Sequence, residues 1–500
     1  MTSEKSPHPE TGQSAAEDAN HTPRFGILFS WRMAVTLLCL LGGTASMLGR
    51  VVTSFAVLCM VREEGADNDT SPVDGGQVTG EFAWSKQYQG VVLSAYFYGY
   101  VAALVIGGWV ADRFPSHKVA ICSAVLQCVP MLLIPEATRA YSWAIIVLRV
   151  LQGIAASAYY PSFNVILRNW SASGEWTLLF SIAWSGGYLG SASAFLVSSR
   201  LCQLQWDGGW PTAFYFSALV VALWTVLACL FLTESPQDHR FASYAEKKYL
   251  ASQPHMQATN NTKIQPVSLW TLLCNLQVWI IMLSYFVTSW FFASLNITLP
   301  MFMKEGFDFD ISQNGFVSAL PSIAMCIMMI VGGNLCHYLH VEKGISTTNT
   351  RKISAAAGLF IPAACMAVVI NLPVSQRVLG VILISLAQGM SSIVIGSGPV
   401  SGAADIAPQY IGLIWGLASS FGNTTGFLSP LIATAMTPNG TLQEWCYFFI
   451  ISIVLMVLLC LLILWKWESQ VQPFACAEKL ERRQKSYRHA DTIVALEEVN

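Results

Sequence analysis

An arginine in an apolar stretch is the residue of this chain best placed to do chemistry. Residues 33–61, MAVTLLCLLGGTASMLGRVVTSFAVLCMV, carry a single charge, Arg50. In a helix that rises about 1.5 Å per residue, Arg50 lies about 26 Å from one end and about 17 Å from the other. An Arg at such depth costs about 2.5–3.5 kcal/mol on membrane insertion and usually faces a bundle interior or a water-filled cavity. We infer that Arg50 receives an anion; the alternative is a structural Arg bound by backbone carbonyl groups.

The composition of the whole chain indicates a membrane protein. Of the 500 residues, 54% are apolar and only 11% are charged, which excludes an ordinary soluble protein. The 13 cysteines are scattered, with no CxxC pair and no Cys/His cluster, so neither a metal site nor a disulfide scaffold is expected. No P-loop, HExxH or GxSxG motif occurs, so we expect no enzyme and no cofactor. Membrane lipid is an expected partner, and nucleic acid is not.

Twelve apolar segments divide the chain into two halves of six. We expect an all-α polytopic membrane protein with a disordered N-terminal tail at 1–30, and both tails on the cytoplasmic side. A six-helix bundle follows at 31–232 with a luminal loop at 62–86, then a cytoplasmic linker at 233–270, a second six-helix bundle at 271–467 and a C-terminal tail at 468–500. The expected spans are 33–61, 88–111, 118–137, 142–167, 177–199, 211–232, 273–303, 312–339, 353–371, 377–400, 408–434 and 443–466.

The orientation follows from the Lys and Arg residues, which gather on one side of the predicted spans. That side is cytoplasmic by the positive-inside rule. The acidic loop 62–86 then faces the lumen or exterior, where the sequons at Asn68 and Asn439 are expected to be glycosylated. The cytoplasmic set comprises Arg113, Lys118, Arg168, Arg240, Lys247, Lys248, Lys263, Lys343, Arg351, Lys352 and the basic residues between Lys479 and Arg488.

A repeat relates the two halves. Gly90 and the pair at 107–108 recur 225 residues later as Gly315 and the pair at 332–333, and Gln152-Gly153 has an echo in Gln388-Gly389. Two six-span halves with matching glycines indicate the major facilitator architecture, two pseudo-symmetric six-helix bundles with a substrate site near the midplane between them.

The segment GGWVADRFPSHK at 107–118 resembles the GxLaDrxGrk loop between spans two and three of major facilitator transporters. It ends a helix on glycines and places an acid beside basic partners at the membrane boundary. We interpret it as a conformational latch, and the alternative is a solvated loop. The second half has His337 at the acidic position, so a weaker latch or none is expected there. The predicted latch residues are Gly107, Gly108, Asp112, Arg113 and Lys118.

Longer motifs resemble solute carrier family 17, whose members carry organic or inorganic anions. They include WSKQYQGVVLSAYFYGYVAALVIGGWVADR from Trp84, then RVLQGIAASAYYPSFNVILRNW, GWPTAFYF and TESPQDHRFASYAEKKYL in the first half. The second half continues with MKEGFDFDISQNGFVSALP, STTNTRKI and DIAPQYIGLIWGLASSFGNTTGFLSP. The resemblance covers nearly everything from about residue 33 to 470.

The resemblance implies a binding site made by two arginines. The family's first-span arginine corresponds to Arg50 and its fourth-span arginine to Arg149 in RVLQG. Each guanidinium can offer a fork of donors to the paired oxygens of a carboxylate, phosphate or sulfonate. Further polar and aromatic groups are expected in the same cavity, although helix packing is the alternative for each. The predicted substrate-binding set adds Tyr98, Gln152, Tyr160, Trp290 and Ser401, and Tyr159, Asn296 and Ser397 are further polar or aromatic groups there.

Departures from the family pattern bear on coupling. Ala156 stands where the family's fourth span usually has a glutamate, the leading candidate for proton coupling, and a methyl group cannot bind a proton. Thr288, Leu93 and Ala404 stand where the glutamate-transporter branch has an arginine and two histidines, so glutamate is not favoured as substrate.

We therefore expect an alternating-access transporter of a small organic or inorganic anion, driven by membrane potential or by the substrate gradient. The alternatives are a proton- or sodium-coupled symporter of the same family, with Na⁺ or Cl⁻ as a further partner, and a transport-dead sensor or trafficking protein that keeps the fold. A monomer is expected. Vesicular, lysosomal and plasma membranes are all left open.

Overall fold

The computed structural model describes residues 30–62, 80–171, 176–204, 206–251, 269–339, 343–407 and 410–475. These ranges are mainly helical, and the only extended pairing within them is an isolated bridge between Val61 and Phe82. Ten helices or continuous helix pairs are long and apolar enough to cross a membrane. The other two expected spans correspond to the 26-residue helix α8 and to the consecutive helices α19 and α20. The all-α polytopic fold is therefore confirmed.

The first bundle begins with the long helix that carries Arg50. Ser30 caps this helix by accepting a hydrogen bond from the Met33 N–H, and Val61 ends it in an extended conformation. The bundle comprises α3 (Trp31–Met60), α4 (Lys86–Arg113), α5 (Ser116–Ala140), α6 (Ala144–Ala156), α7 (Tyr159–Trp170), α8 (Trp176–Leu201) and α9 (Trp210–Phe231).

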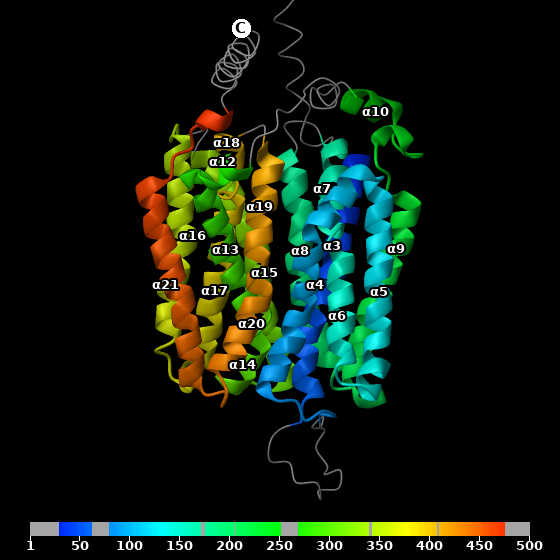
Figure 1. Cartoon of the computed structure of the whole chain (residues 1–500), viewed down its shortest axis with the longest axis vertical. Coiled ribbons are helices and arrows are strands. Elements are labelled where there is room, and N and C mark those ends of the chain that lie inside the picture. Colours follow the sequence, from blue (N-terminus) through cyan, green and yellow to red (C-terminus); the bar gives the residue numbers. More distant parts are fainter. Residues whose placement is uncertain are drawn as a thin grey trace, which may run out of the picture.

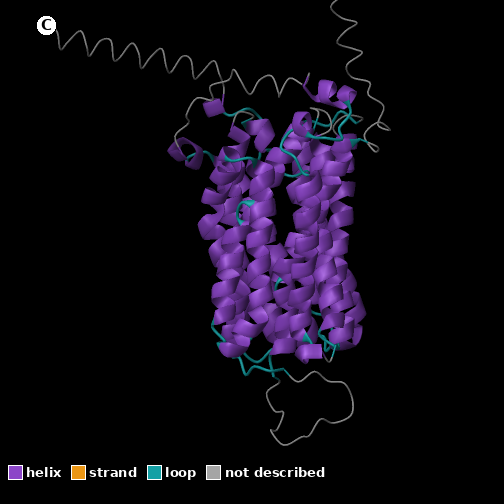
Figure 2. Cartoon of the chain, turned by 90° about the vertical axis from the view of Figure 1, so that its right-hand side faces the viewer, coloured by secondary structure: helices purple, strands orange, loops and turns teal. Residues whose placement is uncertain are grey.

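The second bundle lies beside the first, with its helices roughly parallel to theirs (Figures 1 and 2). Short helices α10 (Tyr244–Ala251), α12 (Leu269–Leu273) and α18 (Ala403–Ile406) lie at the end predicted to be cytoplasmic. The second bundle itself comprises α13 (Leu276–Asn296), α14 (Leu299–Glu305), α15 (Ile311–His337), α16 (Thr347–Val369), α17 (Arg377–Gly396), α19 (Ile411–Asn423), α20 (Thr425–Met436) and α21 (Leu442–Lys466).

Two spans are interrupted just before a proline, the α6–α7 span near its middle and the α13–α14 span nearer its predicted luminal end. Pro161 lies close to the start of α7, and Pro300 lies close to the start of α14. Proline has no N–H to donate and its ring clashes with the carbonyl four residues earlier, which favours a break there, although α5 continues through Pro130 and Pro135. Seventh-span helix α13 accordingly ends at Asn296. Broken helices of this kind line binding sites in many transporters.

Glycines allow close contacts within and between the bundles. A Cβ on Gly107 would lie 2.6 Å from the Ser157 backbone, at the junction of α6 and α7. A Cβ on Gly426 would lie 2.0 Å from the ring of Phe97, where α20 of the second bundle crosses α4 of the first. At the predicted luminal end, Lys86 of α4 forms an ion pair with Glu305 of α14 and joins the two bundles again.

Residues 233–251, the first described part of the 233–270 segment, pack against the predicted cytoplasmic ends of the first bundle. Glu246 accepts hydrogen bonds from the backbone N–H groups of Trp31 and Arg32 at the start of α3. Glu234 accepts from the backbone N–H of His117. The sequence predicts only a linker here, and the structure shows that its first half fixes the helix ends.

Candidate functional site

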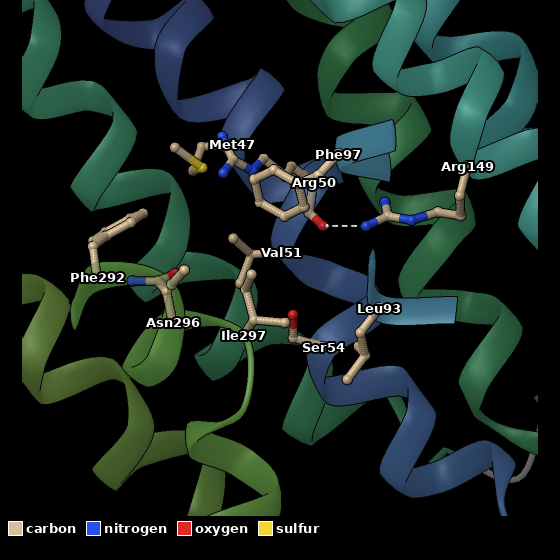
Figure 3. A pocket seen from close by; sticks show the side chains of 11 residues that line it. Met47, Arg50, Val51, Ser54, Leu93, Phe97, Arg149, Phe292, Asn296 and Ile297 are labelled. Carbon is tan, nitrogen blue, oxygen red and sulfur yellow. Dashed lines mark hydrogen bonds between the residues drawn. The ribbon is translucent and has the colours of Figure 1, made fainter. Parts of the chain in front are cut away.

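A small pocket lies between the two bundles, lined by residues of both (Figure 3). Helices α3, α4 and α6 of the first bundle form one wall, and the end of α13 forms the other. Its open space is about 10 Å³, roughly that of one water molecule and too small for an organic anion. The lining residues are Met47, Arg50, Val51, Ser54, Leu93, Phe97, Arg149, Phe292, Ala293, Asn296 and Ile297.

The guanidinium of Arg50 lies among aromatic rings. Its central carbon is 4.3 Å from the ring centre of Phe97, 5.3 Å from that of Tyr96 and 6.0 Å from that of Tyr100. Aromatic faces attract a cation but leave its N–H donors unused. Among the residues that the structure describes, the Arg50 side chain has no hydrogen-bond or carboxylate partner. These donors are therefore available to an anion.

Arg149 is held differently. It is 2% exposed, and its guanidinium donates to the side-chain oxygen of Gln152 at 2.9 Å and to the backbone carbonyl of Arg50 at 3.0 Å. Figure 3 shows the bond to the Arg50 carbonyl, and a longer bond of 3.5 Å reaches the carbonyl of Gly49. The structural role considered above for Arg50 thus fits Arg149. Only its buried Nε lacks a partner among the described residues.

The match to a family model decides the class of protein. The description of that model is Major Facilitator Superfamily, and it covers residues 39–430. The chain belongs to this superfamily. Two similar solved structures are a bacterial homologue of the human lysosomal transporter Spinster and a D-xylose-proton symporter. Both have a TM-score of 0.64 and 14% identity. The alignment with the Spinster homologue covers 88% of this chain and 99% of the homologue. The alignment with the symporter covers 89% of this chain and 100% of the symporter.

Within the major facilitator superfamily, the curated relatives are members of solute carrier family 17, which confirms the resemblance. The uncharacterized transporter slc-17.2 of Caenorhabditis elegans is 28% identical over 92% of this chain and 95% of its own length. Vesicular glutamate transporter 1 of Bos taurus is 30% identical over 77% of this chain and 69% of its own length. Human sialin is 28% identical over 76% of this chain and 75% of its own length. The chain is thus a multi-pass membrane transporter homologous to the anion carriers of family 17.

In this family 17 protein, only some of the other predicted residues lie near Arg50. Gln152 does, because it bonds both Arg149 and the carbonyl of Gly49. Tyr98 packs on the ring of Phe427 in the second bundle, and Trp290 donates to Ser452. Tyr160 is on α7, close enough to Arg50 to interact electrostatically with its guanidinium, and its buried hydroxyl has no partner among the described residues. None of these last three lines the pocket.

Ser401 lies in a separate polar cluster near the predicted cytoplasmic end of the second bundle. Its hydroxyl accepts a hydrogen bond of 2.6 Å from Arg351. Arg351 also forms an ion pair of 3.1 Å with Asp405. Sequence reasoning expects a weak latch or none in this half, because His337 replaces the acid. An ion pair is nevertheless present there, supplied by another helix.

The residues of the predicted latch are only partly engaged. Gly107 approaches the α6–α7 junction closely, whereas a Cβ on Gly108 would meet nothing within 4 Å. The side chains of Arg113 and Lys118 are exposed, and the side chain of Asp112 lies outside what the structure describes. The role of these residues as a latch therefore stays a prediction.

The two glycosylation predictions also stay untested. Asn68 lies outside the described residues. Asn439 is exposed in the loop before α21, where its side-chain nitrogen donates to Glu444 at 2.8 Å.

Two pocket features escape the sequence prediction. Phe97, rather than Tyr98, lies closest to the guanidinium of Arg50. Ser54 also lines the pocket, one helical turn after Arg50 on α3. The spacing of four residues is a signal that was available for Ser54, because residues i and i+4 share a helix face. Asn296, expected in the cavity on sequence grounds, does line it.

Proposed function

We propose that this protein moves an organic anion across a membrane by alternating access, driven by the membrane potential or by the gradient of the anion itself. The observation that carries the proposal is the guanidinium of Arg50, which faces a pocket between the bundles without a carboxylate among the described residues. The names of two relatives, vesicular glutamate transporter and sialin, support an anionic substrate. The membrane is vesicular, lysosomal or plasma membrane.

Charge explains why an anion and a voltage suit this pocket. A cation at this depth is costly unless a counter-charge joins it, so an anion that binds Arg50 removes that cost for the loaded carrier. Moving one charge through 100 mV corresponds to about 2.3 kcal/mol. That energy concentrates a monovalent anion about fiftyfold with no other ion involved.

The pocket offers little for proton coupling. Ala156, at the position of the family's glutamate, is fully buried at the end of α6. None of the residues that line the pocket is acidic. Na⁺ coupling is the alternative mechanism within the same class, because backbone carbonyl groups at broken helices can hold that ion.

The second candidate is a ligand sensor that binds an anion without moving it. The specific observation in its favour is the small open space of about 10 Å³ between the bundles. A sensor binds an anion through Arg50 yet produces no flux under any gradient.

Proteoliposomes with purified protein test both candidates. Radiolabelled organic anions are offered under either a potassium-diffusion potential, positive inside, or a pH gradient of similar size. We expect uptake to follow the voltage, to ignore the pH gradient and to disappear in Arg50→Ala. Strict dependence on the proton gradient contradicts the mechanism. Arg50-dependent binding without uptake favours the sensor instead.

A further inference from the structure

The polar groups of the pocket are few and lie apart from one another. Seven of the lining residues are apolar, so specific recognition falls to the remainder. Arg50 supplies the charge. Ser54 follows it four residues later on α3, about 6 Å along the helix axis. Asn296 faces the same space from the end of α13 (Figure 3).

Asn296 is only half satisfied. It is 4% exposed, and its side-chain oxygen has no hydrogen-bond partner among the described residues. Its side-chain nitrogen reaches the hydroxyl of Ser322 at 3.5 Å, the outer limit of a hydrogen bond. A buried amide left without a partner is destabilising, and buried polar groups in native proteins are normally paired. A ligand that supplies the missing partner is therefore favoured over one that does not.

Ser54 adds a second unused polar group. Its side chain is buried, with 4% exposed, and no partner for its hydroxyl occurs in the described ranges. Several other buried serines in these helices instead donate to the carbonyl three or four residues earlier, as Ser94 does to Gly90 and Ser284 to Ile280. Ser54 and Asn296 thus present hydrogen-bonding groups to the pocket from opposite bundles.

We propose that this pocket selects anions that carry a hydroxyl group a short carbon chain away from the acidic group. Arg50 binds the acid, and Ser54 and Asn296 bind the hydroxyl. A hydroxyl both donates and accepts, so it matches the amide of Asn296 and the hydroxyl of Ser54 together. The apolar lining covers the carbon chain between them. The inference rests on the proposed anion binding at Arg50 and adds the substrate class.

The experiment compares matched ligands that differ by one hydroxyl. Affinities of 4-hydroxybutyrate and butyrate are measured on the purified full-length protein by calorimetry, for the wild type and for Asn296→Leu. A site built to hydrogen-bond a hydroxyl rejects the analogue that lacks it, because its buried groups stay unpaired. We expect a preference of about tenfold for the hydroxy acid in the wild type, corresponding to one net hydrogen bond, and a ratio near one in Asn296→Leu.

Ser322→Ala is the control variant. It removes the other partner of Asn296 without removing a group that lines the pocket, so the hydroxyl preference should persist. If Asn296 only joins α13 to α15, both variants change the two affinities equally and the inference is wrong. If neither acid binds, or if Arg50→Ala binds both normally, the proposed anion site itself is wrong. Arg50-dependent binding with an unchanged ratio in Asn296→Leu overturns the hydroxyl inference alone.

Discussion

The different surroundings of the two arginines predict different consequences when each is removed. Arg50 contacts aromatic rings and has unused N–H donors, whereas Arg149 donates hydrogen bonds to Gln152 and to the backbone of α3. We expect Arg50→Ala to abolish anion binding and leave the fold nearly as stable. We expect Arg149→Ala to destabilise the fold, because it leaves Gln152 and a buried carbonyl without their partner.

The magnitudes follow from the contacts. Hydrogen bonds to a charged group contribute about 1.5–3 kcal/mol each, so the two short bonds of Arg149 correspond to a loss of about 3 kcal/mol or more. The ring contacts of half-buried Arg50 correspond to about 1 kcal/mol. For anion affinity the order of the two arginines reverses, because removing Arg50 costs more than removing Arg149. Two charge-assisted bonds from Arg50 correspond to about 3 kcal/mol, which is more than a hundredfold in Kd.

Melting of the purified variants in detergent, together with uptake into proteoliposomes, measures both effects. Arg50→Lys and Arg149→Lys are the matched controls, since each keeps the charge and loses the planar fork. We expect Arg50→Lys to retain part of the uptake and Arg149→Lys to stay unstable, because a point charge cannot reach both acceptors. A greater loss of melting temperature in Arg50→Ala than in Arg149→Ala would refute the reasoning.

Three further predictions concern the periphery of the site. Gly107→Ala lowers the melting temperature, because its Cβ would lie 2.6 Å from backbone atoms, whereas Gly108→Ala, with open space around it, raises stability by up to about 1 kcal/mol through helix propensity. In a double-mutant cycle of melting temperatures, Lys86→Ala and Glu305→Ala show a coupling of about 1 kcal/mol, and simple additivity contradicts their pairing. Burial lowers the pKa of His239 below its usual 6.5, so the folded protein binds this proton less readily than the unfolded chain. The contribution of neutral His239 is therefore complete above about pH 6.5 and is lost as pH falls below it, which a pH series of melting curves on wild type and His239→Gln measures.

The fold and the position of Arg50 were predictable from the sequence for a simple physical reason. A membrane-spanning helix needs a long apolar run, and a single charge inside that run needs a polar environment that only a bundle interior provides. Residues 33–61 carry both signals, and α3 occupies almost the same range. The relation between the halves was also visible, because most of the repeated glycines, such as Gly90 and Gly315, lie where helices approach closely.

The different roles of the two arginines, anion binding for Arg50 and structural bonding for Arg149, were not predictable from the sequence. Whether a guanidinium faces an anion site or a backbone carbonyl depends on which neighbouring helix lies within its reach, and sequence spacing does not report that. The aromatic run AYFYGY shows the same limit. Each residue turns the helix by 100°, so Phe97 and Tyr98 point in different directions, and the orientation of α4 in the bundle decides that Phe97 lies over Arg50.

The distribution of polar groups connects recognition with movement. Arg50 belongs to the first bundle and Asn296 to the second, so a ligand that contacts both gains its second contact only when the bundles are close together. A ligand shifts a conformational equilibrium only by the difference in its affinity for the two states. An anion that lacks the hydroxyl would bind Arg50 almost equally in open and closed states and would promote closure weakly. Under the proposed selectivity, hydroxylated anions are therefore expected to be transported faster as well as bound more tightly, and equal transport rates for the matched acids at saturation would separate recognition from movement.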